Sequence, residues 1–155
     1  MANTNPIFSG SGLISNSRIT NSITALTGST GVAATGVSGT GGEMIVVCTA
    51  DATNGSYLER VRLRWTATTP TATTATTVRL YISSVTSGVT TADNTSCFEE
   101  VVMGIQNASN ATAATFPYDI PLNFVLPAGK TLLASVHQKP AASTEISIQC
   151  YGGNF

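Results

Sequence analysis

The chain has 155 residues, which is enough for one domain with a hydrophobic core, and 42% of its residues are hydrophobic. Only 10% are charged, against about 25% in typical soluble domains, and the formal net charge is −1. This balance argues against nucleic acid as the main partner, and no run of about 18 apolar residues predicts a membrane span. A neutral surface rich in hydroxyl groups opposes self-association only weakly, so it suits a tightly assembled oligomer.

Residues 1–42 are rich in Gly, Ser, Thr and Asn, with scattered apolar residues that are too few to fold alone. We interpret them as an extended N-terminal arm, with Ile19, Ile23 and Leu26 as candidate anchors on a partner or a neighbouring subunit. The alternative is a tail or linker without such contacts. Neither a basic nor an apolar segment of a secretory signal is present at the start, so we expect the protein to stay where it is made.

Residues 43–155 show the period-2 alternation of β-strands. In residues 57–65 the arginines Arg60, Arg62 and Arg64 alternate with apolar residues, which predicts one wet face and one dry face. The wet face is interpreted as solvated or as a subunit contact. Seven strands are expected, over 44–49, 58–67, 77–83, 98–105, 118–124, 131–138 and 145–151. Their number, spacing and turns predict an all-β fold: an antiparallel β-sandwich, jelly-roll-like, with an extended N-terminal arm.

Three cysteines, Cys48, Cys97 and Cys150, have no zinc-binding spacing, and their odd number prevents complete internal pairing. Cys48 and Cys150 lie in predicted strands, where a buried free thiol behaves as a small apolar residue. Cys97 follows a polar stretch and is the cysteine expected to be exposed. It is the candidate for a disulfide between subunits in an oxidising environment.

The residues needed for catalysis do not come together in the sequence. His137 is the only histidine and has no nucleophile motif beside it. Glu99 and Glu100 are adjacent on a predicted strand and therefore point to opposite faces, so we expect a structural ion pair with a neighbouring arginine. Trp65 is expected in the core rather than in a sugar-binding platform with the tyrosines. No catalytic, cofactor-binding or metal-ligating residue is predicted, and the protein is not expected to be an enzyme.

An ordered set of short motifs nevertheless resembles a known group. The set consists of residues 54–64 (NGSYLERVRLR), 74–82, 98–101, 120–129 (ending in LPAG), 132–135 and 151–155 (YGGNF). It resembles small virion proteins encoded in the structural modules of tailed phages and prophages. The resemblance covers about residues 43–155, leaves the arm unmatched, and brings no catalytic residue.

The resemblance implies a structural virion protein, a capsid decoration or cement protein, made in the host cytoplasm and placed on the capsid surface. It would bind the outer shell and stabilise contacts between subunits of the major capsid protein, and a homotrimer is expected. The alternative function is a glycan-binding, receptor-recognising module of a tail fibre or baseplate, which would need exposed aromatic residues.

Overall fold

The structure is a computed structural model that describes residues 12–19, 32–35, 44–67, 71–85, 88–90, 93–108, 115–138, 140 and 143–155. For residues 12–19, 32–35, 88–89 and 108 it describes the backbone alone. Every regular element in these ranges is a strand, so none of them is a helix that could span a membrane. The predicted all-β class is confirmed.

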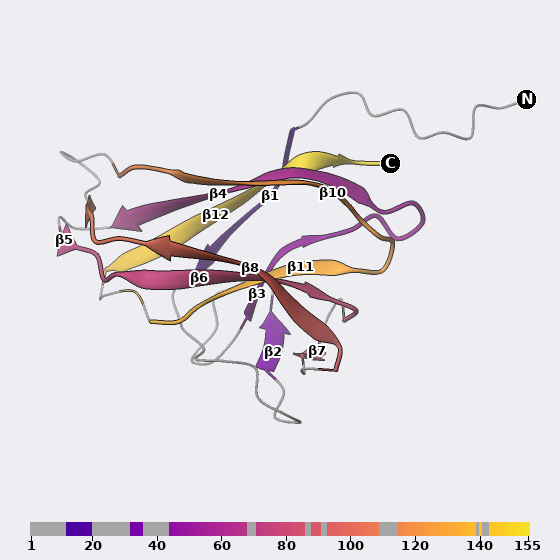
Figure 1. Cartoon of the computed structure of the whole chain (residues 1–155), viewed down its shortest axis with the longest axis horizontal. Coiled ribbons are helices and arrows are strands. Elements are labelled where there is room, and N and C mark those ends of the chain that lie inside the picture. Colours follow the sequence, from indigo (N-terminus) through magenta and orange to yellow (C-terminus); the bar gives the residue numbers. More distant parts are fainter. Residues whose placement is uncertain are drawn as a thin grey trace, which may run out of the picture.

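Two sheets pack face to face, as the two layers of arrows in Figure 1 show. The first sheet has the order β1-β12-β4-β10 and the second has the order β7-β2-β3-β11-β6-β8. A short pair, β5-β9, lies apart. The bounds are β1 Gly12–Ile19, β2 Val32–Thr35, β3 Met44–Thr49, β4 Ser56–Ala67, β5 Thr71–Ala72, β6 Thr76–Ser83, β7 Gly88–Thr90, β8 Thr95–Met103, β9 Asn107–Ala108, β10 Tyr118–Leu126, β11 Thr131–Val136 and β12 Thr144–Asn154.

The eight longest strands are arranged in the two sheets in the order of a jelly roll. Without the short β2, β5, β7 and β9, the first sheet contains the first, eighth, third and sixth strands, and the second contains the second, seventh, fourth and fifth. Consecutive strands thus cross from one sheet to the other at nearly every connection, which wraps the chain around a single core. These eight strands pair antiparallel, whereas β2 runs parallel to β3.

All seven predicted strands are present, and two further segments join the sheets from within residues 1–42. β1 pairs with β12 from Gly12 to Ile19, and β2 pairs with both β3 and β7. A division of the chain at residue 42 therefore separates β1, the first strand of the jelly roll, from the sheet to which it belongs. The polar composition of this segment concealed β1, because an added edge strand is held by backbone hydrogen bonds that need no apolar run.

The core lies between the two sheets and is built from the alternating residues of the central strands. β12 alternates buried and half-buried residues from Thr144 to Gly152. β4 does the same with Val61, Leu63 and Trp65, all of which are at most 1% exposed. Trp65 is therefore a core residue, as predicted, and its indole Nε1 donates to the backbone oxygen of Gly104 at 3.3 Å. Because the core fixes these central strands, it also fixes the strands that flank them.

Candidate assembly surface

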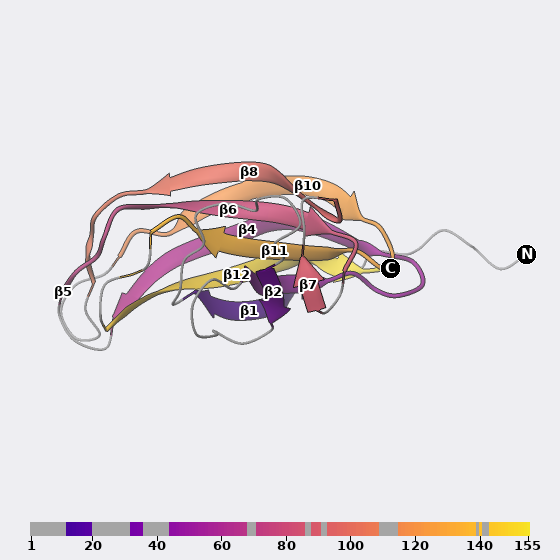
Figure 2. The same ribbon diagram turned by 90° about the horizontal axis from the view of Figure 1, so that it is seen from below.

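The strands β8 and β10 both run along one side of the sandwich (Figure 2), where each forms the edge of its own sheet. β8 is unusual because every residue from Ser96 to Glu100 is exposed, although a sandwich strand ordinarily buries alternate residues. The register with β6 shifts between Leu80 and Tyr81, which leaves Phe98 as the extra residue of a β-bulge. Bulges on edge strands redirect side chains, and this one turns an aromatic ring toward β10.

Phe98 meets Phe124 of β10 across the gap between the two edges. Their ring centroids lie 5.7 Å apart and the rings are nearly perpendicular, at 84°, which is a favoured aromatic geometry. Phe124 is itself at a second irregularity, since the register of β10 with β4 shifts between Pro121 and Phe124 and Asn123 there has a φ of 52°. The two bulges thus place one aromatic pair where the sheets come together at their edges.

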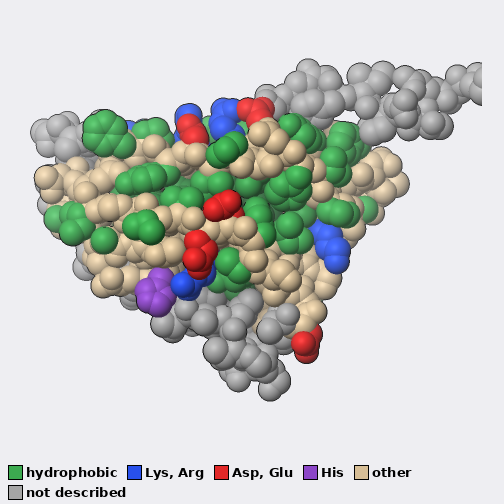
Figure 3. All heavy atoms as spheres, in the orientation of Figure 1, with side chains coloured by type: hydrophobic (Ala, Val, Ile, Leu, Met, Phe, Trp, Pro, Cys, Tyr) green, Lys and Arg blue, Asp and Glu red, His purple; other side chains and the backbone are tan. Residues whose placement is uncertain are grey.

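The large exposed apolar side chains of the described residues lie on β8, on β10 and on the segments next to them, and we call this set the apolar edge. Its most exposed side chains are Phe116 at 78%, Val102 at 71%, Ile105 at 67%, Val125 at 49% and Phe98 at 38%. Val101, Leu122 and Phe124 are partly buried and pack against the core. Figure 3 shows many hydrophobic side chains on the face that β8 and β10 present in this view, with acidic side chains among them. Exposed apolar side chains that cluster in this way are typical of a surface that becomes buried in a complex.

A polar network holds one end of the apolar edge in place. The side chain of Gln106 accepts from the backbone nitrogen of Phe116 at 2.8 Å and donates to its backbone oxygen at 3.4 Å. The same amide nitrogen lies 3.3 Å from the hydroxyl of Tyr118, and the backbone of Gln106 pairs with that of Thr73. Ile105 and Phe116 are therefore exposed on segments whose backbones are fixed, so contacts there would cost little ordering entropy.

β8 also carries exposed charged groups and a cysteine next to the exposed apolar residues. Glu100 forms an ion pair with Arg79 of β6, as predicted for this acidic pair. The hydrogen bond with Glu100 raises the pKa of Arg79. Cys97 is exposed, as predicted, and desolvation followed by the charge of Glu100 raises the pKa of its thiol. Its role as a disulfide partner between subunits stays a prediction.

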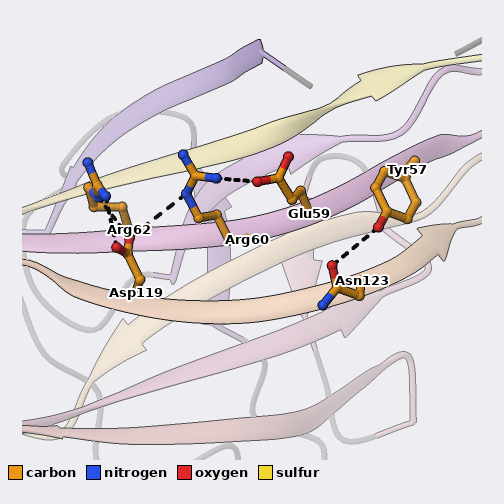
Figure 4. Close-up of polar contacts among 6 residues, drawn as sticks. All are labelled: Tyr57, Glu59, Arg60, Arg62, Asp119 and Asn123. Atoms are coloured by element: carbon orange, nitrogen blue, oxygen red, sulfur yellow. Dashed lines mark hydrogen bonds and ion pairs between the residues drawn. The ribbon is translucent and has the colours of Figure 1, made fainter. Parts of the chain in front are cut away.

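The arginine face lies on the outer side of the first sheet, shown in Figure 4. Arg62 donates two hydrogen bonds to Asp119, at 2.7 and 2.8 Å, and this bond lowers the pKa of Asp119. Arg60 contacts Glu59 and lies 4.0 Å from Asp119, and its guanidinium carbon sits 4.3 Å from the ring centroid of Tyr151. The guanidinium groups of Arg60 and Arg62 therefore already contact carboxylates and an aromatic ring. Arg64 is exposed, and its Nε donates to the hydroxyl of Thr115 at 3.1 Å.

The residues that could have supported other functions are placed apart from one another. His137 is exposed at the end of β11, with its Nδ1 3.4 Å from a guanidinium nitrogen of Arg79. Among the described residues, no three His, Cys, Asp or Glu side chains form a group that could hold a metal ion. Trp65 and Tyr81 are buried, so neither contributes to an exposed aromatic platform of the kind that glycan binding would need.

The candidate arm anchors fall mostly outside the described residues. Ile19 ends β1, where its Cα pairs with that of Ile146, while Ile23 and Leu26 lie in a part of the chain that the structure does not describe. The apolar edge is not among the features predicted from the sequence. Two signals could have indicated it: Val101 and Val102 break the alternation of β8, and Phe116 stands in a connection rather than in a strand.

Three of the motifs that carry the family resemblance meet at one end of the sandwich. Ser56 of the first motif donates to the side chain of Asn154 in the last, at 2.5 Å, and Phe155 donates its N–H to the oxygen of Gly55 at 3.3 Å. Gly55 has a φ of +82°, and a Cβ built there would lie 2.6 Å from the oxygen of Leu126, which begins the LPAG motif. These motif residues therefore build a structural corner of the sandwich.

In comparisons with known proteins, no family model, no curated protein and no solved structure matches this chain.

Proposed function

We propose that the protein is a structural virion protein: a capsid decoration protein that assembles as a homotrimer, binds the outer capsid shell and stabilises contacts between major capsid subunits. The observation that best supports an assembling protein is the apolar edge, with five large apolar side chains exposed on ordered strands and connections. The resemblance of its ordered motifs supplies the virion context.

The apolar edge is the surface that the copies bury against each other in this proposal. Permanent homo-oligomeric interfaces are the more hydrophobic kind, and a stable interface of ordinary size buries about 1,200–2,000 Å². Complete burial of a side chain such as Phe116 or Val102 contributes about 1.5–3 kcal/mol. The low charge of the chain adds little repulsion between copies. Three linked copies then bind neighbouring capsid subunits with an avidity that one copy lacks.

The experiment is co-sedimentation of the purified protein with mature capsids that lack it. Saturable binding at a fixed ratio to the major capsid protein is the expected result. Binding to tails or to glycans, with none to capsids, would instead favour the receptor-recognising alternative. Binding to neither would remove the virion context while leaving the apolar edge unexplained.

A further inference from the structure

We infer that Cys48 and Cys150 form a disulfide across the core when the chain folds, or opens, in the presence of a small-molecule disulfide. The two thiols come from different sheets, Cys48 from β3 and Cys150 from β12, and their sulfurs lie 3.7 Å apart. A disulfide needs a sulfur separation of about 2.05 Å, so the sulfurs must approach by roughly 1.7 Å. The residues are 102 positions apart in the sequence.

The place of this pair in the fold gives such a bond a large effect. β3 lies between β2 and β11 in one sheet, and β12 lies between β1 and β4 in the other. A bond between them would join two inner strands of opposite sheets. It would also close a long loop of the unfolded chain, which is the condition under which a cross-link restricts that state most.

The same surroundings keep the thiols reduced in the closed fold. Cys48 is 4% exposed and Cys150 is fully buried. The hydrogen bond with Cys150 and burial raise the pKa of the Cys48 thiol, so the reactive thiolate is scarce. Oxidation is therefore expected during folding or transient opening of the sandwich, and the free pair is the expected state in a reducing compartment.

The chemistry is a two-step thiol–disulfide exchange. In the opened chain, one cysteine thiolate attacks a sulfur of the small disulfide, which forms a mixed disulfide and releases one small thiolate. The second cysteine thiolate then attacks the protein sulfur of the mixed disulfide and releases the second small thiolate. The two cysteines are oxidised, the small disulfide is reduced, and the two protons end on the released small thiols.

The test uses the full chain carrying Cys97→Ser, which removes the exposed thiol and leaves this pair. The protein is unfolded and refolded with oxidised and reduced glutathione, and its free thiols are then counted in denaturant. We expect no free thiol, a loss of about 2 Da without added glutathione, and a 48–150 linked peptide after digestion. The midpoint of thermal unfolding should fall by about 5–15 °C when the refolded protein is reduced.

Two matched proteins complete the test. The Cys97→Ser, Cys48→Ala protein has one thiol, so its thermal midpoint should not respond to reductant. Wild-type protein is refolded in the same way and its disulfide-linked peptides are mapped, so that the test does not depend on the folding of the Cys97→Ser variant. The wild-type protein should also give the 48–150 peptide. Two free thiols in refolded, native Cys97→Ser protein, or a wild-type peptide that links Cys97 to either buried cysteine, would overturn the inference.

Discussion

The centre of the sandwich and its β8–β10 side use the same kinds of residue in opposite ways. At the centre, Leu63, Trp65 and Ile148 are at most 1% exposed, because each sheet covers the inner face of the other. At the β8–β10 side the coverage ends, and Phe116 and Val102 are more than two-thirds exposed. Apolar side chains at the centre stabilise the fold, whereas those at the edge are available to a partner.

Because of this difference, side chains at the centre determine the stability of the fold, and side chains on the apolar edge determine association with a partner. A side chain in the centre has already left water when the chain folds, so truncating it changes the free energy of unfolding. A side chain on the apolar edge leaves water only when a partner covers it, so its replacement should change association alone. Matched truncations at the centre and at the edge therefore distinguish the two roles.

Trp65→Ala should lower the free energy of unfolding by about 3–5 kcal/mol, because it opens a cavity between the sheets and removes the indole hydrogen bond to Gly104. Urea denaturation of the variant measures the loss. Phe116→Ala is the matched aromatic truncation at the edge, and it should remain within about 0.5 kcal/mol of wild type under conditions in which both are monomeric. Equal losses in the free energy of unfolding of the two variants would contradict the difference between the centre and the edge.

Gln106→Ala should lower the free energy of unfolding by about 1–2 kcal/mol, since it removes the side-chain bonds to the backbone of Phe116 and to Tyr118. The exchange of backbone amides near residues 105 and 116 should quicken, which hydrogen exchange can follow. Gln138→Ala, at an exposed glutamine beyond β11, serves as the control. Unchanged exchange in the Gln106 variant would show that this network does not hold the edge.

Asp119→Asn should lower the free energy of unfolding by less than about 1 kcal/mol at pH 7, since the Arg62–Asp119 pair is about two-fifths exposed and screened by solvent. The pKa of Asp119 is lowered in the folded state, so the stability from this pair is present above the unfolded carboxyl pKa of about 3.9. It is lost as the pH falls through the lower, folded pKa.

The measurement for that pair is denaturation of wild type and Asp119→Asn between pH 7 and pH 2. The difference between them should shrink toward the acidic end. The comparison is needed because backbone N–H groups of Asn54 and Thr53 also lower the pKa of Asp51, and this carboxyl is present in both proteins. A difference that stays constant with pH would contradict the assignment to the carboxylate.

The central strands could be predicted from the sequence because the alternation of apolar and polar side chains involves only residues that are neighbours in the chain. The 44–49 strand has the predicted bounds, and β4, with its alternating arginines, differs only at its first residues. β1 could not be predicted, because its place beside β12 depends on the backbone of a segment more than 100 residues away rather than on an apolar pattern of its own.

The apolar edge could not be predicted because exposure depends on which strand lies at the end of each sheet. The segment 98–105 was predicted as a strand, yet one sequence does not tell whether a neighbour covers it. The bulge at Phe98 arises from a register shift against β6, which is a tertiary property. By contrast, the exposed position of Cys97 and the ion pair of Glu100 depend on local polarity and adjacent charge, and both were anticipated.

The most direct test of the assembly surface is the mass of the free protein in solution, measured by light scattering for wild type and two lysine variants. Val102→Lys adds a charge to the apolar edge, and Ala52→Lys adds the same charge to an exposed turn between β3 and β4. Both should fold with nearly wild-type stability. We predict trimers for wild type and Ala52→Lys and monomers for Val102→Lys. A Val102→Lys protein that stays trimeric, or a wild-type protein that is monomeric at high concentration, would contradict the account.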